Sequence, residues 1–158
     1  MMLAFLYLAA RRGELFRLTW DDVDFTTNMV RLTTRKRKDG SLAEDWLPMA
    51  DELRAALLTH RDFVGGVYVF PAPGGGPYLY RIHLMERLCK KAGVRKFGFH
   101  AIRHLSATTL AEAGVPFIKI SQILRHRSLA VTERYLQRLG DLKEALEVLK
   151  RNGQQRRN

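Results

Sequence analysis

The stretch LRHRSLAVTERYL, residues 124–136, places a histidine nine residues before a tyrosine, among three arginines. Nine residues make about two and a half turns of an α-helix, so on one unbroken helix His126 and Tyr135 would point in opposite directions. Ser128 is a good N-cap, and the apolar run behind it predicts a second helix that begins there. We therefore expect a helix to end near Arg125–His126 and a bend that can bring His126 and Tyr135 to one site.

The length and composition indicate one globular domain with a strongly basic surface. The chain has 158 residues, of which 46% are apolar and 27% charged, and this balance excludes a disordered protein. The 27 Lys and Arg residues against 16 Asp and Glu give a net charge of +11, which favours a polyanionic partner. Nucleic acid is the leading candidate, and an anionic membrane surface comes second.

Cysteine usage and the N-terminal segment narrow the cellular setting. Cys89 is the only cysteine, which excludes an intrachain disulfide and a zinc-binding thiolate cluster and fits a reducing cytoplasm. The apolar opening MMLAFLYLAA is too short to span a bilayer and lacks the basic start of a signal peptide. We expect it to be a buried helix whose beginning is missing.

The hydrophobic pattern predicts an α+β domain, mainly helical, with one small antiparallel sheet. Residues 1–19 read as helical, Trp20–Asp24 as a turn into a strand, and residues 29–48 as a β-hairpin around Asp39-Gly40. A short strand is expected at 67–70. Further helices are predicted over 51–60, 80–92, 101–113, 117–125, 129–138 and 141–151.

A basic cluster opens one of these helices, in the sequence FHAIRH. His100, Arg103 and His104 have the spacing that places side chains on one helical face, and a helix N-terminus suits a phosphate. The alternative is a solvated basic face. A metal site is a weaker interpretation, because Ala101 stands where a metalloprotease helix has glutamate and no third ligand is apparent.

Two more cationic segments are candidates for phosphate contact. In ARRGE, Glu14 follows Arg11 by three residues and can orient its guanidinium for bidentate binding; the alternative is an ordinary surface ion pair. The hairpin tip TTRKRKDG carries four cations, one of which can reach a phosphate as a proton donor. For the other three, a grip on the DNA backbone is the simpler interpretation.

Other signals in the chain are interpreted as structural. The glycine-rich PAPGGGP lacks the Gly-Lys-Ser/Thr ending of a phosphate-binding loop. His60 and His83 are isolated and are expected on the surface or in packing. Ser106 lies in mid-helix, where back-bonding to the helix is expected rather than nucleophilic chemistry.

Taken together, these segments resemble the catalytic boxes of the tyrosine recombinases, the phage-integrase family. RRGELFRLTWDDVDF is similar to the first box, HAIRH to the His-x-x-Arg-His box, and ILRHRSLAVTERYL to the last box with its nine-residue step from histidine to tyrosine. The resemblance covers residues 3–150 and implies the catalytic-domain fold of that family. It also implies an enzyme that cuts and rejoins double-stranded DNA in the integration or excision of a mobile element.

The resemblance assigns a role to each catalytic position. Tyr135 attacks the scissile phosphate and forms a 3′-phosphotyrosyl link, without metal or nucleotide cofactor. The phosphate oxygens and the protons are handled by Arg11, Arg103 and His126 as phosphate ligands, His100 as general base and Lys36 as general acid. Lys38 remains an alternative to Lys36. The expected contacts to the DNA backbone are Arg35, Arg37, Lys38 and Arg125.

The chain departs from the family pattern at three places. Arg125 replaces the usual glycine before the histidine, and Leu8-Ala9-Ala10 replaces the usual Thr-Gly before the first arginine. From the resemblance we expect neither the N-terminal DNA-clamping domain of the family nor about one further helix of its catalytic domain in these 158 residues. We thus expect a catalytic domain over 1–152 and a flexible basic tail over 153–158.

Two questions stay open at this level. The helix expected over 141–151 either packs on its own domain or docks into a neighbouring subunit of a tetramer on DNA. The alternatives to a recombinase are a non-catalytic DNA-binding module and, sharing the same chemistry, a type IB topoisomerase.

Overall fold

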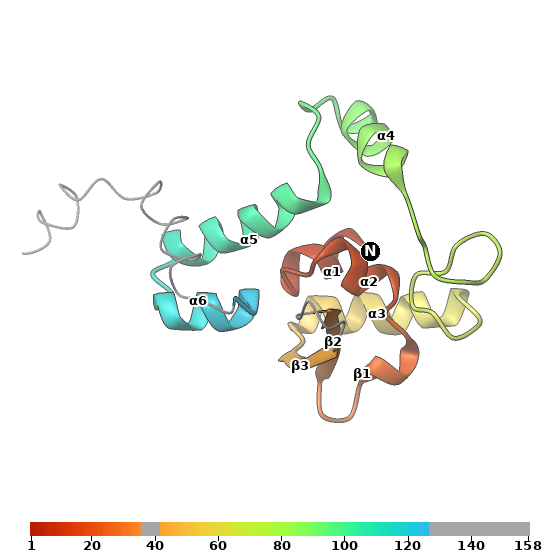
Figure 1. Ribbon diagram of the computed structural model, residues 1–158, viewed down its shortest axis with the longest axis horizontal. Coiled ribbons are helices and arrows are strands. Elements are labelled where there is room, and N and C mark those ends of the chain that lie inside the picture. The colour runs from red at the N-terminus through yellow and green to blue at the C-terminus, as the bar shows by residue number, and fades with distance from the viewer. Residues whose placement is uncertain (36–41, 127–158) are drawn as a thin grey trace, which may run out of the picture. The chain divides into compact units, whose positions relative to one another are not determined.

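The computed structural model of the chain describes residues 1–35 and 42–126 (Figure 1). The chain divides into two compact units, Met1–Ala107 and Thr108–Asn158. The elements of the described residues are α1 (Met2–Tyr7), α2 (Arg12–Phe16), the 3₁₀ helix η1 (Trp20–Asp22), β1 (Val23–Asp24), β2 (Met29–Arg35), β3 (Leu42–Pro48), α3 (Asp51–Phe63), α4 (Ile82–Ala92), α5 (Phe99–Glu112) and α6 (Phe117–Leu124). The α+β class and the mainly helical content are as predicted.

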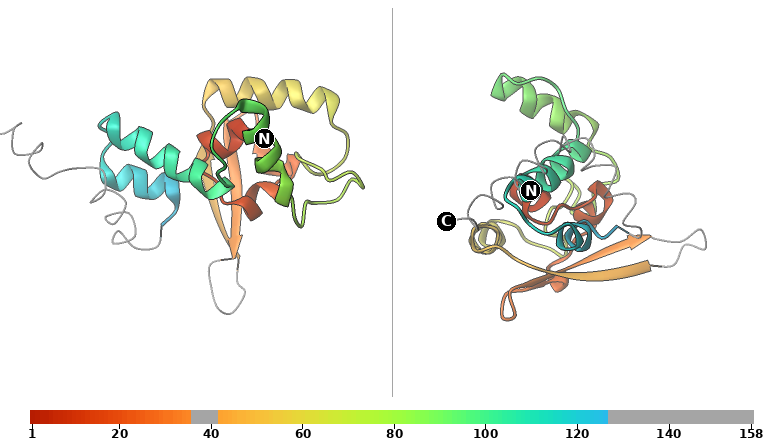
Figure 2. Two further views of the ribbon diagram at one scale, coloured as in Figure 1. Left: turned by 90° about the horizontal axis from the view of Figure 1, so that it is seen from above. Right: turned by 90° about the vertical axis from the view of Figure 1, so that its left-hand side faces the viewer.

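The sheet of the first unit is antiparallel, in the order β1-β2-β3. Strands β2 and β3 pair from Met29 with Pro48 to Arg35 with Leu42, which confirms the hairpin predicted over 29–48. Because side chains alternate along a strand, Val30 and Leu32 lie on one face, and both are fully buried. Figure 2 shows α1, α2 and α3 on the same side of this sheet.

An aromatic cluster joins the N-terminal helices to the start of α5. The ring of Phe5 lies 4.7 Å from that of Phe99, and the ring of Phe16 lies 5.6 Å from Phe99 in an edge-to-face arrangement. Such pairs stabilise by roughly 0.5–1.5 kcal/mol beyond their burial. This cluster fixes the start of α5, which carries His100 and Arg103, against the helices that flank Arg11.

The N-terminal segment differs from its prediction, because residues 1–19 form two short helices rather than one helical stretch. Helix α1 ends at Tyr7 and α2 begins only at Arg12. Between them Ala9 has a φ of 43°, in the left-handed region where a right-handed helix cannot continue. The apolar periodicity ran through the break and gave no sign of it.

Of the other predicted elements, the structure contains the helices that fall on described residues but not the strand at 67–70. The four helices predicted over 51–60, 80–92, 101–113 and 117–125 are present, with ends shifted by a few residues. The strand predicted at 67–70 is wrong, since Tyr68 makes only an isolated bridge to Thr19. The helices predicted over 129–138 and 141–151 and the tail lie outside the described residues. None of the described helices is long and apolar enough to cross a membrane.

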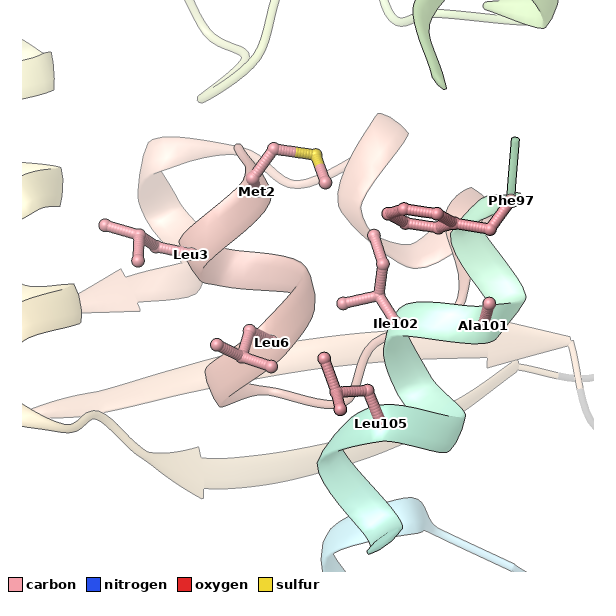
Figure 3. A pocket seen from close by; sticks show the side chains of 7 residues that line it. All are labelled: Met2, Leu3, Leu6, Phe97, Ala101, Ile102 and Leu105. Carbon is pink, nitrogen blue, oxygen red and sulfur yellow. The ribbon is translucent and has the colours of Figure 1, made fainter. Parts of the chain in front are cut away.

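The first unit also has an apolar pocket, between α1 and the beginning of α5 (Figure 3). Its volume is about 360 Å³, and its lining consists of Met2, Leu3, Leu6, Phe97, Ala101, Ile102 and Leu105. No titratable side chain faces it. The pocket therefore offers no side chain for acid–base or nucleophilic chemistry.

Candidate active site

Arg11 is the N-cap of α2 and is held by a carboxylate one turn further on. Glu14 accepts from the Arg11 backbone N–H through Oε2 at 2.7 Å and from Nη1 through Oε1 at 2.9 Å. The Glu14 side chain is only 1% exposed, whereas that of Arg11 is 37% exposed. The pair is thus not an ordinary surface ion pair: a buried carboxylate orients a guanidinium that still faces solvent.

Glu14 has a third donor, from a strand twenty residues away. The Thr34 hydroxyl on β2 donates to Glu14 Oε1, the same oxygen that accepts from Arg11. The N-terminus of α2 is therefore fastened to the sheet as well as to Arg11. A buried carboxylate needs such donors, because an ionised group without them would be costly to desolvate.

The second carboxylate of the first box repeats this arrangement. Asp22 Oδ2 accepts from the Thr19 backbone N–H at 3.0 Å and from its hydroxyl at 2.7 Å. Its Oδ1 accepts from Arg31 Nε on β2 at 2.8 Å, and this hydrogen bond raises the pKa of the Arg31 guanidinium. Glu14 and Asp22 thus tie the segment from α2 to η1 to strand β2.

Arg103 links the second box to the first. Its Nη1 donates to the carbonyl oxygen of Ala9, two residues before Arg11 and 94 residues away in the sequence. One turn further along α5, the Ser106 hydroxyl donates to the carbonyl of Leu6 at 2.7 Å. The Leu6 carbonyl lies in the last turn of α1 and the Ala9 carbonyl just beyond it, so side chains of α5 bind the chain where α1 ends.

The histidines of the second box lie on one side of α5, as their spacing predicts. The rings of His100 and His104 are 4.5 Å apart and nearly perpendicular, at 89°. His100 is exposed and His104 is half-buried. Among the residues that the structure describes, no three His, Cys, Asp or Glu side chains gather closely enough to hold a metal ion.

The described part of the second unit contains the start of the last box. Helix α6 ends at Leu124, and Arg125 follows in the left-handed conformation with φ 52° and ψ 45°. The N–H of Arg125 donates to Gln122 O at 2.9 Å and the N–H of His126 to Ser121 O at 3.1 Å, the two bonds of a Schellman motif. The predicted end of a helix at Arg125–His126 is confirmed.

The Arg125 side chain lies back along its own helix. It is 6% exposed, and its Nη1 donates to the carbonyl of Ile123 at 2.9 Å. A contact from this residue to DNA, expected from the sequence, therefore requires the side chain to leave that carbonyl. The contact stays a prediction.

Several predicted site residues fall outside the described part of the chain. These are Lys36, Arg37, Lys38 and Tyr135. Arg35 ends β2 and pairs with Leu42.

Sequence reasoning missed Thr34, Ser106 as a donor to α1, and the Ala9 carbonyl. A signal for Thr34 was available, because the alternation of β2 places it on the inward face with Val30 and Leu32. A hydroxyl at such a position calls for a buried polar partner. His60, expected in packing, does pack: its Nε2 lies 2.8 Å from the carbonyl of Val69. Ser106 also back-bonds to Ile102 O at 3.0 Å, as expected.

The sequence model of the phage integrase family matches residues 1–140 of the chain. The chain belongs to the phage integrase family. A XerC-like tyrosine recombinase of Caldanaerobacter subterraneus is 26% identical over 77% of the chain. The tyrosine recombinase XerC of Mycobacterium leprae is 32% identical over 79% of it. The chain spans only 40% and 44% of these two relatives.

Solved members of the phage integrase family share the fold. The Tn1549 transposon integrase in complex with transposon right-end DNA superposes with a TM-score of 0.77, at 22% identity over 95% of this chain and 57% of its own. The XerA recombinase superposes with a TM-score of 0.72, at 27% identity over 98% of this chain and 56% of its own. The fold is thus that of a tyrosine recombinase catalytic domain.

Proposed function

We propose that residues 1–152 are the catalytic domain of a site-specific tyrosine recombinase, which cuts and rejoins double-stranded DNA through a 3′-phosphotyrosyl intermediate. The observation that carries the proposal is the hydrogen bond from Arg103 to the carbonyl of Ala9. It joins the arginine of the second box to the turn that presents Arg11, and Glu14 holds the Arg11 guanidinium toward solvent. Two arginine boxes far apart in sequence are therefore built into one junction of the fold.

The junction suits a reaction in which negative charge develops on a phosphate. As Tyr135 attacks, charge accumulates on the non-bridging oxygens, and a guanidinium fixed in advance stabilises it without reorganising. Arg11 supplies such a group. Arg103 would supply a second; since it is only 2% exposed, the phosphate reaches it only if the side chains that cover it open.

Proton transfer would fall to side chains at the edges of this site. A free tyrosine phenol has a pKa of about 10, so Tyr135 would have to lose its proton as it attacks, and the exposed His100 is the proposed base. Lys36 at the hairpin tip, or Lys38, would protonate the departing 5′ oxygen. His126 would add a hydrogen bond to the phosphate. The phosphodiester energy is kept in the tyrosyl ester, so the reaction has no need of a nucleotide cofactor.

The proposed partner is double-stranded DNA. The net charge of +11 favours it, and the Tn1549 integrase was solved with transposon DNA. The basic side chains Arg35, Arg37, Lys38 and Arg125 are proposed backbone contacts. Assembly into a tetramer through residues 141–151 is part of the same proposal.

The test is covalent trapping on nicked duplexes built from the ends of the mobile element that encodes the chain. The wild-type chain should form a protein–DNA adduct that survives denaturation and persists in EDTA. Tyr135→Phe should bind the same DNA and form none. An equal yield of adduct from Tyr135→Phe would overturn the nucleophile assignment, and binding without any adduct would indicate a non-catalytic DNA-binding module.

A further inference from the structure

We propose that Thr34 is a positioning residue for Arg11, acting through the carboxylate of Glu14. The inference rests on the proposed function in one respect, the role of Arg11 at the scissile phosphate. Thr34 has no expected part in the chemistry and lies on β2, outside the three boxes. Its hydroxyl donates to the same carboxylate oxygen that accepts from the Arg11 guanidinium.

The donors to the Glu14 carboxylate are of two kinds: some are fixed in place and one can adjust. Oε2 is held by the backbone N–H of Arg11 at 2.7 Å, and this donor is fixed by the start of α2. Oε1 accepts both the Thr34 hydroxyl and Arg11 Nη1. The guanidinium is the adjustable member, because it ends a long flexible side chain, whereas Thr34 is short and branched at Cβ.

Strand β2 makes Thr34 a rigid support. Thr34 pairs across the sheet with Ala43, in a ladder that is continuous from Met29 to Arg35. The carboxylate plane is thus defined by one donor from α2 and one from β2. With both in place, the direction of the Oε1 lone pairs, and so that of Arg11, is set before any ligand arrives.

Removal of the Thr34 hydroxyl should leave the Glu14 carboxylate, and with it the Arg11 guanidinium, less firmly oriented. Valine has nearly the shape of threonine but cannot donate, so in Thr34→Val the carboxylate loses its donor from β2 and can turn more freely about its last torsion angle. The Arg11 guanidinium, bonded to the turning oxygen, should follow it. A misplacement of 1 Å at a catalytic group can slow a reaction by about 100-fold.

Thr33 provides a matched control on the same strand. It precedes Thr34, points to the opposite face of the sheet and pairs with Glu44 rather than Ala43. Thr33→Val therefore makes the same chemical change without touching the carboxylate. Thr34→Ser is the rescue variant, because it loses the methyl group and keeps the hydroxyl.

The first measurement is made on the free full-length chain by NMR of the Arg11 guanidinium. Rotation about its Nε–Cζ bond should be slow in the wild type and several-fold faster in Thr34→Val. Thr34→Ser and Thr33→Val should resemble the wild type. An unchanged rotation rate in a folded Thr34→Val, or no recovery in Thr34→Ser, would overturn the proposal.

The second measurement follows adduct formation at saturating DNA. Thr34→Val should slow the covalent step by about 10- to 100-fold while the affinity for DNA stays within about twofold. A faster guanidinium together with an unchanged covalent step would also overturn the positioning role. If the wild-type chain forms no adduct, it is the proposed function that fails, and the NMR result alone decides the link between Thr34 and Arg11.

Discussion

Ala9 and Arg125 have a left-handed backbone although neither is a glycine. Ala9 has a φ of 43° and Arg125 a φ of 52°. Without glycine, each position costs roughly 1–2 kcal/mol of backbone strain. At Ala9 a change to glycine would lose a buried methyl worth ~0.8 kcal/mol and loosen the unfolded chain by ~0.4–1 kcal/mol, so the terms nearly cancel.

At Arg125 the strain can be isolated by comparing two variants. Both Arg125→Gly and Arg125→Ala lose the hydrogen bond to Ile123, but only glycine relieves the backbone. We expect Arg125→Gly to be the more stable by about 1 kcal/mol, the reverse of their order inside a helix. Urea unfolding of the two variants measures the difference. Greater stability of Arg125→Ala would show that the left-handed turn does not persist in solution.

At the scale of elements, the C-terminal end of α1 is fastened to α5 by side-chain donors from α5. Ser106→Ala removes the donor to Leu6 O. We expect this variant to lose about 1 kcal/mol of unfolding free energy, the usual contribution of one hydrogen bond. The exposed Thr109→Ala on the same helix should change stability by less than about 0.5 kcal/mol. Equal effects of the two changes, measured by urea unfolding, would contradict the fastening of α1 by α5.

The Asp24 carboxylate in the turn between β1 and β2 should make the stability of the folded chain depend on pH. Asp24 accepts from the Thr27 hydroxyl at 2.6 Å and from the backbone N–H groups of Thr27 and Thr26. These hydrogen bonds, the hydroxyl first, lower the pKa of Asp24 below its usual range. A carboxylate whose folded pKa is lowered stabilises at neutral pH, and this contribution is lost as the pH falls through the folded pKa.

The matching variant is Asp24→Asn, which keeps an acceptor oxygen and loses the charge. Wild type should be the more stable at pH 7, and its advantage should shrink between about pH 5 and pH 2. Urea unfolding across this range measures it. An advantage that does not change with pH would mean that the charge on Asp24 is not what the turn uses.

At the scale of the whole molecule, the sequence predicted more of the elements than of their junctions. The alternation around Val30 and Leu32 predicted the hairpin, because one face of that sheet must be buried. The break at Ala9 was not predictable from periodicity, since an alanine gives no local sign of a left-handed backbone. The carbonyl at this break accepts from Arg103, a contact between residues 94 apart in the sequence.

In the candidate site, too, the local contacts were predictable from the sequence and the contacts between elements were not. The pairing of Arg11 with Glu14 follows from a three-residue spacing and was expected. That Glu14 is buried, and that Thr34 completes its hydrogen bonds, depends on the packing of α2 against β2. Local spacing cannot show that packing, although the inward position of Thr34 in its strand was a usable sign.

The central claim is that Arg11, oriented by a buried carboxylate, is the guanidinium that binds the scissile phosphate. Arg12 follows it directly, carries the same charge and is exposed, so it is a matched control. The most direct measurement compares the rates of covalent adduct formation by Arg11→Ala and Arg12→Ala on the same nicked duplex. We predict a loss of about 100- to 1,000-fold for Arg11→Ala, the effect of removing one transition-state donor, and a change within about threefold for Arg12→Ala. Equal losses would show that the basic surface matters only as charge, and would contradict the claim.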